Sequence, residues 1–549
     1  MHKIQKMQQL LSKNGVKAFL LPNCDEFQNE YLPEYNKRIE WLTSFTGSNA
    51  TLIITPEQCI FSTDGRYIVQ AKKELDLDYF TMISKKPWEW LEENKISEVS
   101  YDPTLYTETQ LTPYIKAGIN LITLDHNPVD ILWHDRAQFV PSDVKDHSNY
   151  AGKSSKNKCQ DLAGDEAFFM SDPASICWLL NIRGNDVKHT PLLLCYAILY
   201  PNGTVALFLP GKCNIDLDEH VTIYNISALQ SILANLQKVA LDPTYTVMYF
   251  IKMLRAESII RKEDPCQIAK ACKNSIELTG IETAHQRDGI AMTKFLYWLK
   301  HTQGWSEKSA ADQLLSYRQE QDRFQDLSFS TISAFGEHGA IIHYTTCTDE
   351  PISGDNLYLI DSGGQYLDGT TDVTRTVAIG HITEEQKYYY TLVLKGHIAL
   401  ANAIFPIGTT GKQLDILARQ YLWRDGQNYP HGTGHGVGHY LGVHEGPHSF
   451  SSDIPLQVGM ILSNEPGFYK VSEYGIRIES IMQVVEKNDQ YLGFKTLTCV
   501  PIDLSAVNKS LLSNEEINWL NNYHNTLYNT IKDSLDDTIK EWLENNIFI

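Results

Sequence analysis

Histidine and glycine crowd together in one short stretch late in the chain. Five of the 18 histidines fall between positions 431 and 448, and glycine occupies every second position from 432 to 438. Alternating glycine disfavours a regular helix, so we expect an irregular, tightly packed loop that brings imidazoles close to a ligand. A phosphate cradle would need a Lys-Ser or Lys-Thr ending, which this stretch lacks. The pattern indicates a functional cluster drawn from His431, His435, His439, His444 and His448.

Two aspartates could complete a site with these imidazoles. Asp361 closes the apolar run 357–360, and Asp372 follows eleven positions later. On one straight strand this odd separation would put them on opposite faces, but the intervening glycines allow the chain to reverse, so that the carboxylates face each other across a hairpin. Two carboxylates held that close repel unless a cation lies between them. For this pair alone, turn and cap roles explain the sequence as well as metal binding does.

Two glutamates add further oxygen ligands. Glu465 precedes a Pro-Gly turn after the apolar residues 460–462, so we expect it at the end of a strand. Glu479 lies in residues 476–485, whose alternating polarity predicts one continuous strand. A single charged strand residue is usually just solvated. Four carboxylates with one imidazole, however, suit a pair of Mn²⁺, Co²⁺, Fe²⁺ or Zn²⁺ ions, which would sit ~3.5–4 Å apart and polarise a carbonyl for attack by water.

The part of the chain that carries these residues is expected to be an α+β domain. Apolar residues recur at helical spacing after Lys273, from Ile276 to Leu299. Residues 357–361, 371–379 and 476–485 are predicted strands, and 384–403 is a predicted helix. An apolar helical stripe over residues 511–549 predicts a C-terminal helical extension that packs on a core.

A repeated pattern marks the first half of the chain. Ile39, Trp41, Leu42 and Gly47 recur at the same spacing as Ile176, Trp178, Leu179 and Gly184, and an apolar, β-prone run follows each copy. Coincidence is the alternative for a match of four positions. The polar residues 140–161 suit a linker between two copies. We therefore expect two related α/β domains, at 1–145 and 146–263, followed by the α+β domain at 264–549.

Size and charge narrow the class of protein. A chain of 549 residues is too long for one hydrophobic core. The formal charge of −20 disfavours an extended phosphate-binding surface, so nucleic acid is not an expected partner. Residues 1–16 lack the apolar core of a secretory signal, and no run approaches 18 apolar residues, so we expect no membrane association and a cytoplasmic location with reduced cysteines.

Taken in order, these motifs resemble the pita-bread metallopeptidases, and most closely the long, three-domain, cytosolic type of Xaa-Pro aminopeptidase (aminopeptidase P). The matching segments are 38–42, 45–48, 64–67 and 178–184 in the first half, and 342–344, 359–366, 368–376, 431–438, 443–447, 464–467 and 475–479 in the second. The resemblance implies two creatinase-N-like α/β domains followed by a pita-bread α+β catalytic domain.

Carried over position by position, the resemblance also implies residue roles. Asp361 would bind one metal ion, His435 and Glu465 the other, and Asp372 and Glu479 would bridge two ions, with Mn²⁺ the expected metal. His343 and His444 match histidines that shuttle protons or stabilise the intermediate, and His431 matches one that lines the substrate pocket. His439 matches no fixed histidine and receives no role.

The implied reaction is removal of the residue that precedes a proline, from peptides with proline at the second position. A water or hydroxide activated by two metals would attack the carbonyl that precedes the proline, with Glu465 as general base. The long type also implies a homodimer. Two alternatives stay open: prolidase, which shares the fold and the five ligands but cleaves only dipeptides, and a non-catalytic pita-bread protein that binds peptides. Cleavage of an Xaa-Pro-Xaa tripeptide would distinguish the aminopeptidase from a prolidase. The metal content per chain would distinguish it from a non-catalytic protein.

Overall fold

Two six-stranded mixed sheets in the first half of the chain share one topology. The first has the order β4-β3-β2-β1-β5-β6 and comprises β1 (Phe19–Pro22), β2 (Thr51–Ile54), β3 (Cys59–Ser62), β4 (Phe80–Ile83), β5 (Glu98–Tyr101) and β6 (Asn120–Thr123). The second has the order β12-β11-β10-β8-β13-β14 and comprises β8 (Ala167–Met170), β10 (Tyr196–Leu199), β11 (Val205–Leu209), β12 (Val221–Asn225), β13 (Val239–Leu241) and β14 (Ile259–Arg261).

Strand directions also agree between the two sheets. In each, the first strand runs antiparallel to one neighbour, β2 or β10, and parallel to the other, β5 or β13. The repeated tryptophans occupy equivalent helices, α2 (Arg38–Thr43) and α8 (Pro173–Leu180), which both lie between the first and second strands. The prediction of two related α/β domains is therefore confirmed.

The computed structural model describes residues 2–549 and divides them into two compact units. The first contains the described residues up to Ser148 together with Lys153–Cys266, and so holds both sheets; the second contains Asn149–Gly152 and Gln267–Ile549. None of the helices in residues 2–549 combines the length and apolar character that crossing a membrane requires.

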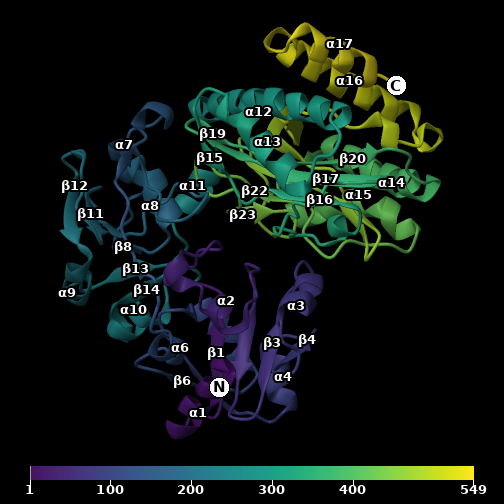
Figure 1. Cartoon of the computed structure of the whole chain (residues 1–549). Helices are drawn as coiled ribbons and strands as arrows, with labels where there is room; N and C mark the ends of the chain where they lie inside the picture. Colours follow the sequence, from purple (N-terminus) through teal and green to yellow (C-terminus); the bar gives the residue numbers. More distant parts are fainter. Residues whose placement is uncertain (1) are drawn as a thin grey trace. The chain divides into compact units, whose positions relative to one another are not determined.

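Short helices accompany the two sheets of the first unit (Figure 1). They are α1 (Lys3–Lys13), α3 (Ile68–Glu74), α4 (Pro87–Glu93), α5 (Glu108–Lys116), α6 (Pro128–Leu132), α7 (Ser155–Leu162), α9 (Leu229–Ala234) and α10 (Met248–Met253), with α11 (Cys266–Ala271) at the boundary. The predicted linker 140–161 is partly wrong, because Ser154 caps α7 by accepting the Asn157 N–H and β7 (Lys145–Asp146) pairs with β9 (Ile182–Arg183).

The second unit combines long helices with several antiparallel sheets. Its helices are α12 (Ser275–His301), α13 (Glu307–Gln319), α14 (Glu384–Ala401), α15 (Gly411–Arg424), α16 (Asn514–Ile531) and α17 (Asp537–Asn546). The C-terminal α16 and α17 contact α12 (Figure 1). Leu520, Leu527 and Ile531 are buried there, as the stripe predicted, whereas Ile276, in the first turn of α12, is exposed.

The strands of this unit form two three-stranded sheets, a six-stranded sheet and a hairpin. In one, β18 (Gly364–Tyr366) pairs with β15 (Phe324–Leu327) and β19 (Gly369–Thr370). In the other, β17 (Asn356–Ser362) pairs with β16 (Ile332–Phe335) and β20 (Val373–Ile379). The larger sheet has the order β21 (Ile404–Pro406), β28 (Tyr491–Thr496), β27 (Ser480–Asn488), β24 (Ile461–Asn464), β22 (His435–Gly436) and β23 (Glu445–Ser449). β25 (Gly467–Lys470) and β26 (Tyr474–Arg477) form the hairpin.

Candidate metal centre

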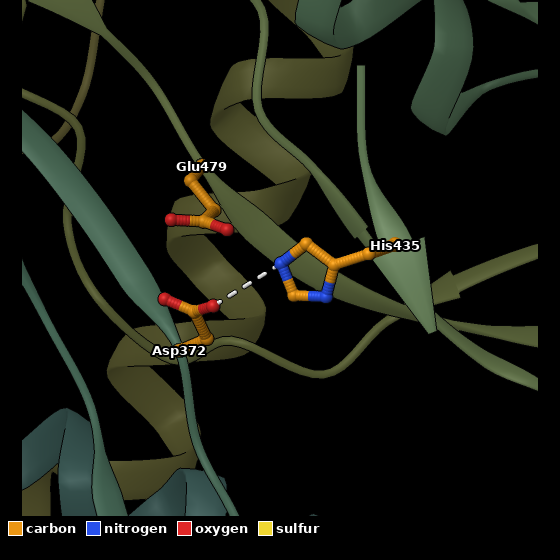
Figure 2. A group of neighbouring side chains, drawn as sticks. All are labelled: Asp372, His435 and Glu479. Atoms are coloured by element: carbon orange, nitrogen blue, oxygen red, sulfur yellow. Dashed lines mark ion pairs between the residues drawn. The ribbon is translucent and has the colours of Figure 1, made fainter. Parts of the chain in front are cut away.

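Three side chains from distant parts of the second unit converge on one point. Asp372 immediately precedes β20, His435 opens β22, and Glu479 lies between β26 and β27. Figure 2 shows the three pointing toward one another, and one potential ligand atom from each lies within 4.8 Å of the others. His435 Nε2 is 3.5 Å from Asp372 Oδ2. This is the spacing of groups that can share a cation.

Glu479 lies in a break between strands, so the prediction of one continuous strand over 476–485 is wrong. β26 pairs with β25, whereas β27 pairs with β24 and β28. In the break, the Glu479 N–H donates to the Thr374 carbonyl at 3.1 Å, and the Thr374 hydroxyl donates to Glu479 Oε2 at 2.7 Å. These bonds take the backbone out of the ladder and fix the carboxylate toward Asp372 and His435.

Asp361 and Glu465 flank the three converging residues. Asp361 lies in β17 opposite Thr374 of β20, so the two aspartates belong to neighbouring antiparallel segments, as the hairpin interpretation predicted. Glu465 directly follows β24, and its Oε1 is 3.6 Å from His435 Nε2. Ser463 connects the two, because its hydroxyl accepts the His435 N–H at 2.9 Å and donates to Glu465 Oε1 at 3.3 Å.

Close backbone packing explains glycine at two positions of the loop. A Cβ on Gly434 would lie 2.0 Å from the carbonyl oxygen of Ser463, and one on Gly436 would lie 2.2 Å from that of Glu445. Neither glycine has a positive φ. Glycine is therefore required here for close approach of strands and not for a left-handed turn.

The electrostatics of the site favour bound cations. Within residues 2–549, Asp361 Oδ1 and Asp372 Oδ1 are buried without a hydrogen-bond donor. Burial raises the pKa of Asp361 to about 6, opposed by Arg477, and burial likewise raises the pKa of Glu465 and Glu479. The negative charge of these buried carboxylates exceeds the positive charge of their neighbours, and some carboxylate oxygens have no hydrogen-bond donor. Such a cluster fits divalent ions, which prefer oxygen-rich ligand sets.

His435 responds in the opposite direction. Burial lowers the pKa of its imidazole, but the Asp372 carboxylate and the charge of Glu465 outweigh that effect and raise the pKa to about 9. The surrounding carboxylates thus attract a positive charge onto this ring. A metal ion would supply that charge in place of the proton.

The other histidines singled out by the sequence have distinct positions. The His444 ring lies edge-on to His435, with 4.2 Å between the ring centroids. His431 Nε2 is 2.8 Å from the Tyr469 hydroxyl, and its Nδ1 is 3.9 Å from Glu465 Oε2. His439 is buried, and His448 is buried with its Nε2 2.9 Å from the Ile461 carbonyl. His444 therefore adjoins the proposed ligand His435, and His431 adjoins the proposed ligand Glu465.

His343 is half-buried and lies in the segment that follows the short 3₁₀ helix η5 (Gly336–Ala340). The preceding carbonyl, of Ile342, accepts from Arg477 Nη2 at 3.5 Å, and the same nitrogen donates to Asp361 at 2.5 Å. Arg477 thus links the backbone beside His343 to a carboxylate of the cluster.

Arg477 is a site residue that the sequence reasoning did not single out. Its side chain is buried, and besides Asp361 it donates to the Tyr469 hydroxyl at 2.8 Å and to Thr374 Oγ1 at 3.1 Å. The available signal was its place in the motif 475–479, two positions before Glu479. The alternation of that segment instead suggested an ordinary strand residue.

Comparisons with known proteins agree with this architecture. Residues 279–486 match the protein family described as "Metallopeptidase family M24", and residues 490–547 match the family described as "C-terminal region of peptidase_M24". "Creatinase/Prolidase N-terminal domain" matches twice, at 3–114 and 139–277, which agrees with the two related sheets.

Individual relatives extend over nearly the whole chain. A probable Xaa-Pro aminopeptidase P of Laccaria bicolor is 37% identical over 575 residues, covering 95% of this chain and 89% of the relative. The crystal structure of an X-prolyl aminopeptidase from Caenorhabditis elegans, described as a cytosolic enzyme with a di-nuclear active site, matches with a TM-score of 0.92 and 34% identity over 99% of both chains.

A prolidase from Pyrococcus furiosus is more distant. It matches with a TM-score of 0.50 and 24% identity, over 61% of this chain and 96% of the prolidase, and so shares the fold alone. The extent and identity of the other two matches decide the family. The chain belongs to metallopeptidase family M24 and, within it, to the Xaa-Pro aminopeptidase P family.

Proposed function

We propose that this protein is a metal-dependent aminopeptidase that hydrolyses the bond between an N-terminal residue and a following proline. The convergence of Asp372, His435 and Glu479 within 4.8 Å carries the proposal, in a chain 34% identical to an X-prolyl aminopeptidase over 99% of its length. The proposed ligands are Asp361, Asp372, His435, Glu465 and Glu479. Two divalent ions, which we take to be Mn²⁺, would supply Lewis acidity to the substrate carbonyl and make water more acidic.

The protein's own residues would guide the protons. Glu465, whose raised pKa favours proton acceptance, would take a proton from the attacking water and pass it on. His444, beside His435, and His343 would donate hydrogen bonds to the developing oxyanion or to the leaving nitrogen. In an Xaa-Pro bond that nitrogen is a tertiary amide without a proton of its own, so it must receive one as it leaves. His431, with Tyr469, would line the substrate pocket.

The proposal also covers the cellular location, the oligomeric state and the domain boundaries. We propose a cytoplasmic enzyme, by analogy with the cytosolic enzyme of Caenorhabditis elegans. We also propose a homodimer, which the molar mass in solution would test. The domain boundaries at 145/146 and 263/264 stay predictions, because the two compact units divide the chain only near residue 266.

The direct test measures Mn²⁺-dependent release of the first residue from Xaa-Pro-Xaa tripeptides, Xaa-Pro dipeptides and Xaa-Ala peptides. Wild type is compared with Glu465→Ala and His435→Ala, and with matched controls at exposed positions, Glu486→Ala and His381→Ala. We expect proline-selective cleavage of tripeptides that survives in the controls and is lost in the site variants. Cleavage of dipeptides alone would favour prolidase, and no cleavage with any divalent metal would favour a peptide-binding protein.

A further inference from the structure

A buried glutamate outside the metal centre holds the segment that carries His343. Glu307 is the first residue of α13 and is 2% exposed. Its carboxylate accepts five hydrogen bonds, all from the segment 335–348. Oε1 accepts from the Phe335 N–H and from His338 Nδ1, each at 2.8 Å; Oε2 accepts from the Tyr344 hydroxyl at 2.8 Å and from the Thr348 N–H and hydroxyl at 3.0 Å.

These donors lie on both sides of His343. His338 precedes it in η5, Tyr344 is the next residue, and Thr348 lies five positions beyond. The rings of His338 and Tyr344 also stack, with centroids 4.6 Å apart. Residues 341–350 contain neither helix nor strand. One carboxylate is therefore the common anchor of an otherwise irregular segment.

Five donors require an ionised carboxylate, because a protonated one would present a donor of its own. Burial would raise the pKa of Glu307, but hydrogen bonds from His338, Phe335, Thr348 and Tyr344 hold it below its ordinary value. The backbone reinforces the anchor: the Lys308 N–H donates to the Thr348 carbonyl at 3.0 Å. The first turn of α13 thus grips the segment through backbone and side chain together.

We propose that Glu307 is a positioning residue that fixes the segment 338–348 and so holds His343 where it can reach the substrate's reacting carbonyl or leaving nitrogen. The inference rests on the role given to His343 under the proposed function. None of the five hydrogen bonds that the Glu307 carboxylate accepts comes from a proposed metal ligand. Its effect would therefore pass through His343 and leave metal binding unchanged.

Glu307→Gln tests this with little change in shape. A glutamine presents one acceptor and one NH₂ group, so in either orientation the NH₂ faces at least two of the five donors. We expect kcat to fall on the order of tenfold to hundredfold, because displacing a catalytic group by about 1 Å can cost that much. KM should change less than kcat, and bound Mn²⁺ per chain should stay at the wild-type level.

The decisive comparison is a double-mutant cycle with His343→Ala. If Glu307 acts through His343, adding Glu307→Gln to His343→Ala should lower kcat no further. Tyr344→Phe, which removes one donor and preserves the ring, should give a smaller loss that also vanishes in the His343→Ala background. The matched control is Glu516→Gln, a buried helix-start glutamate that accepts from Lys395 Nζ at 2.6 Å, and it should leave kcat unchanged.

The outcomes separate this inference from the proposed function. Additive losses in the cycle, loss of Mn²⁺ in Glu307→Gln, or an unchanged kcat in that variant would each overturn the positioning role while leaving the aminopeptidase intact. A wild-type kcat in His343→Ala would overturn the role of His343 and this inference with it. Failure of the proposed function itself would appear separately, as absent proline-selective cleavage in the wild type.

Discussion

Alanine at position 434 would place a methyl carbon inside the backbone of a neighbouring strand. The Cβ would lie 2.0 Å from the carbonyl oxygen of Ser463 and 2.7 Å from its carbonyl carbon. Ordinary carbon–oxygen contacts are about 3.3 Å or longer. The loop must therefore move by more than about 1 Å, because neither partner is a flexible side chain that can rotate away.

This displacement would fall directly on the proposed metal ligands. His435 is the next residue, and Ser463, two positions before Glu465, bonds to both of them. We expect Gly434→Ala to cost about 1–3 kcal/mol of stability, as overpacking does. A shift of about 1 Å between ligands should also lower activity on the order of a hundredfold.

Gly432→Ala supplies a control in the same loop. The nearest atom to its Cβ would be the Gly434 nitrogen, at 4.0 Å, and neither glycine has a positive φ. The assay is Mn²⁺-dependent cleavage of an Xaa-Pro-Xaa tripeptide, with bound metal per chain and urea unfolding measured alongside. If Gly434→Ala retained the metal, activity and stability of Gly432→Ala, close approach would not be the reason for glycine at 434.

Three further perturbations test the charges of the structure. Because the pKa of Asp361 is raised to about 6, the metal-free protein loses the stabilising contribution of the protonated carboxyl as pH rises from about 4 through about 6. The Tm difference between Mn²⁺-loaded and chelated protein should therefore grow over this range, and a constant difference would count against the site. Burial lowers the pKa of His524 to about 4, and its Nε2 accepts the Ile502 N–H. Protonation of this ring should therefore lower the free energy of unfolding by up to about 3 kcal/mol as pH falls from 6.5 through 4. In urea unfolding, His524→Gln should flatten this pH dependence. Glu445 forms ion pairs with the buried Lys270 and Lys273. Glu445→Gln should therefore lower the free energy of unfolding by about 3–5 kcal/mol, and by more than Lys270→Met, which leaves Glu445 paired with Lys273. If urea unfolding gave the reverse order, this charge balance would be refuted.

Local sequence patterns predicted the elements that carry the site. The apolar run ending at Asp361 forms β17, and the glycine-rich stretch forms a loop with only a two-residue strand at His435. The repeat around Trp41 and Trp178 predicted two related domains, because the repeated local pattern forms an equivalent helix, α2 or α8, in each copy. These features depend on neighbouring residues, which is why the sequence alone could establish them.

Tertiary structure alone decided how the side chains meet. The alternation around Glu479 predicts a continuous strand, yet a bond from Thr374, 105 residues away, holds this residue in a break. The residues next to Arg477 and Glu307 do not reveal which groups these two side chains bind, because their partners lie far away in the sequence. Sequence fixes residue type and local period, whereas contacts between distant segments depend on how buried charges find their partners when the elements pack.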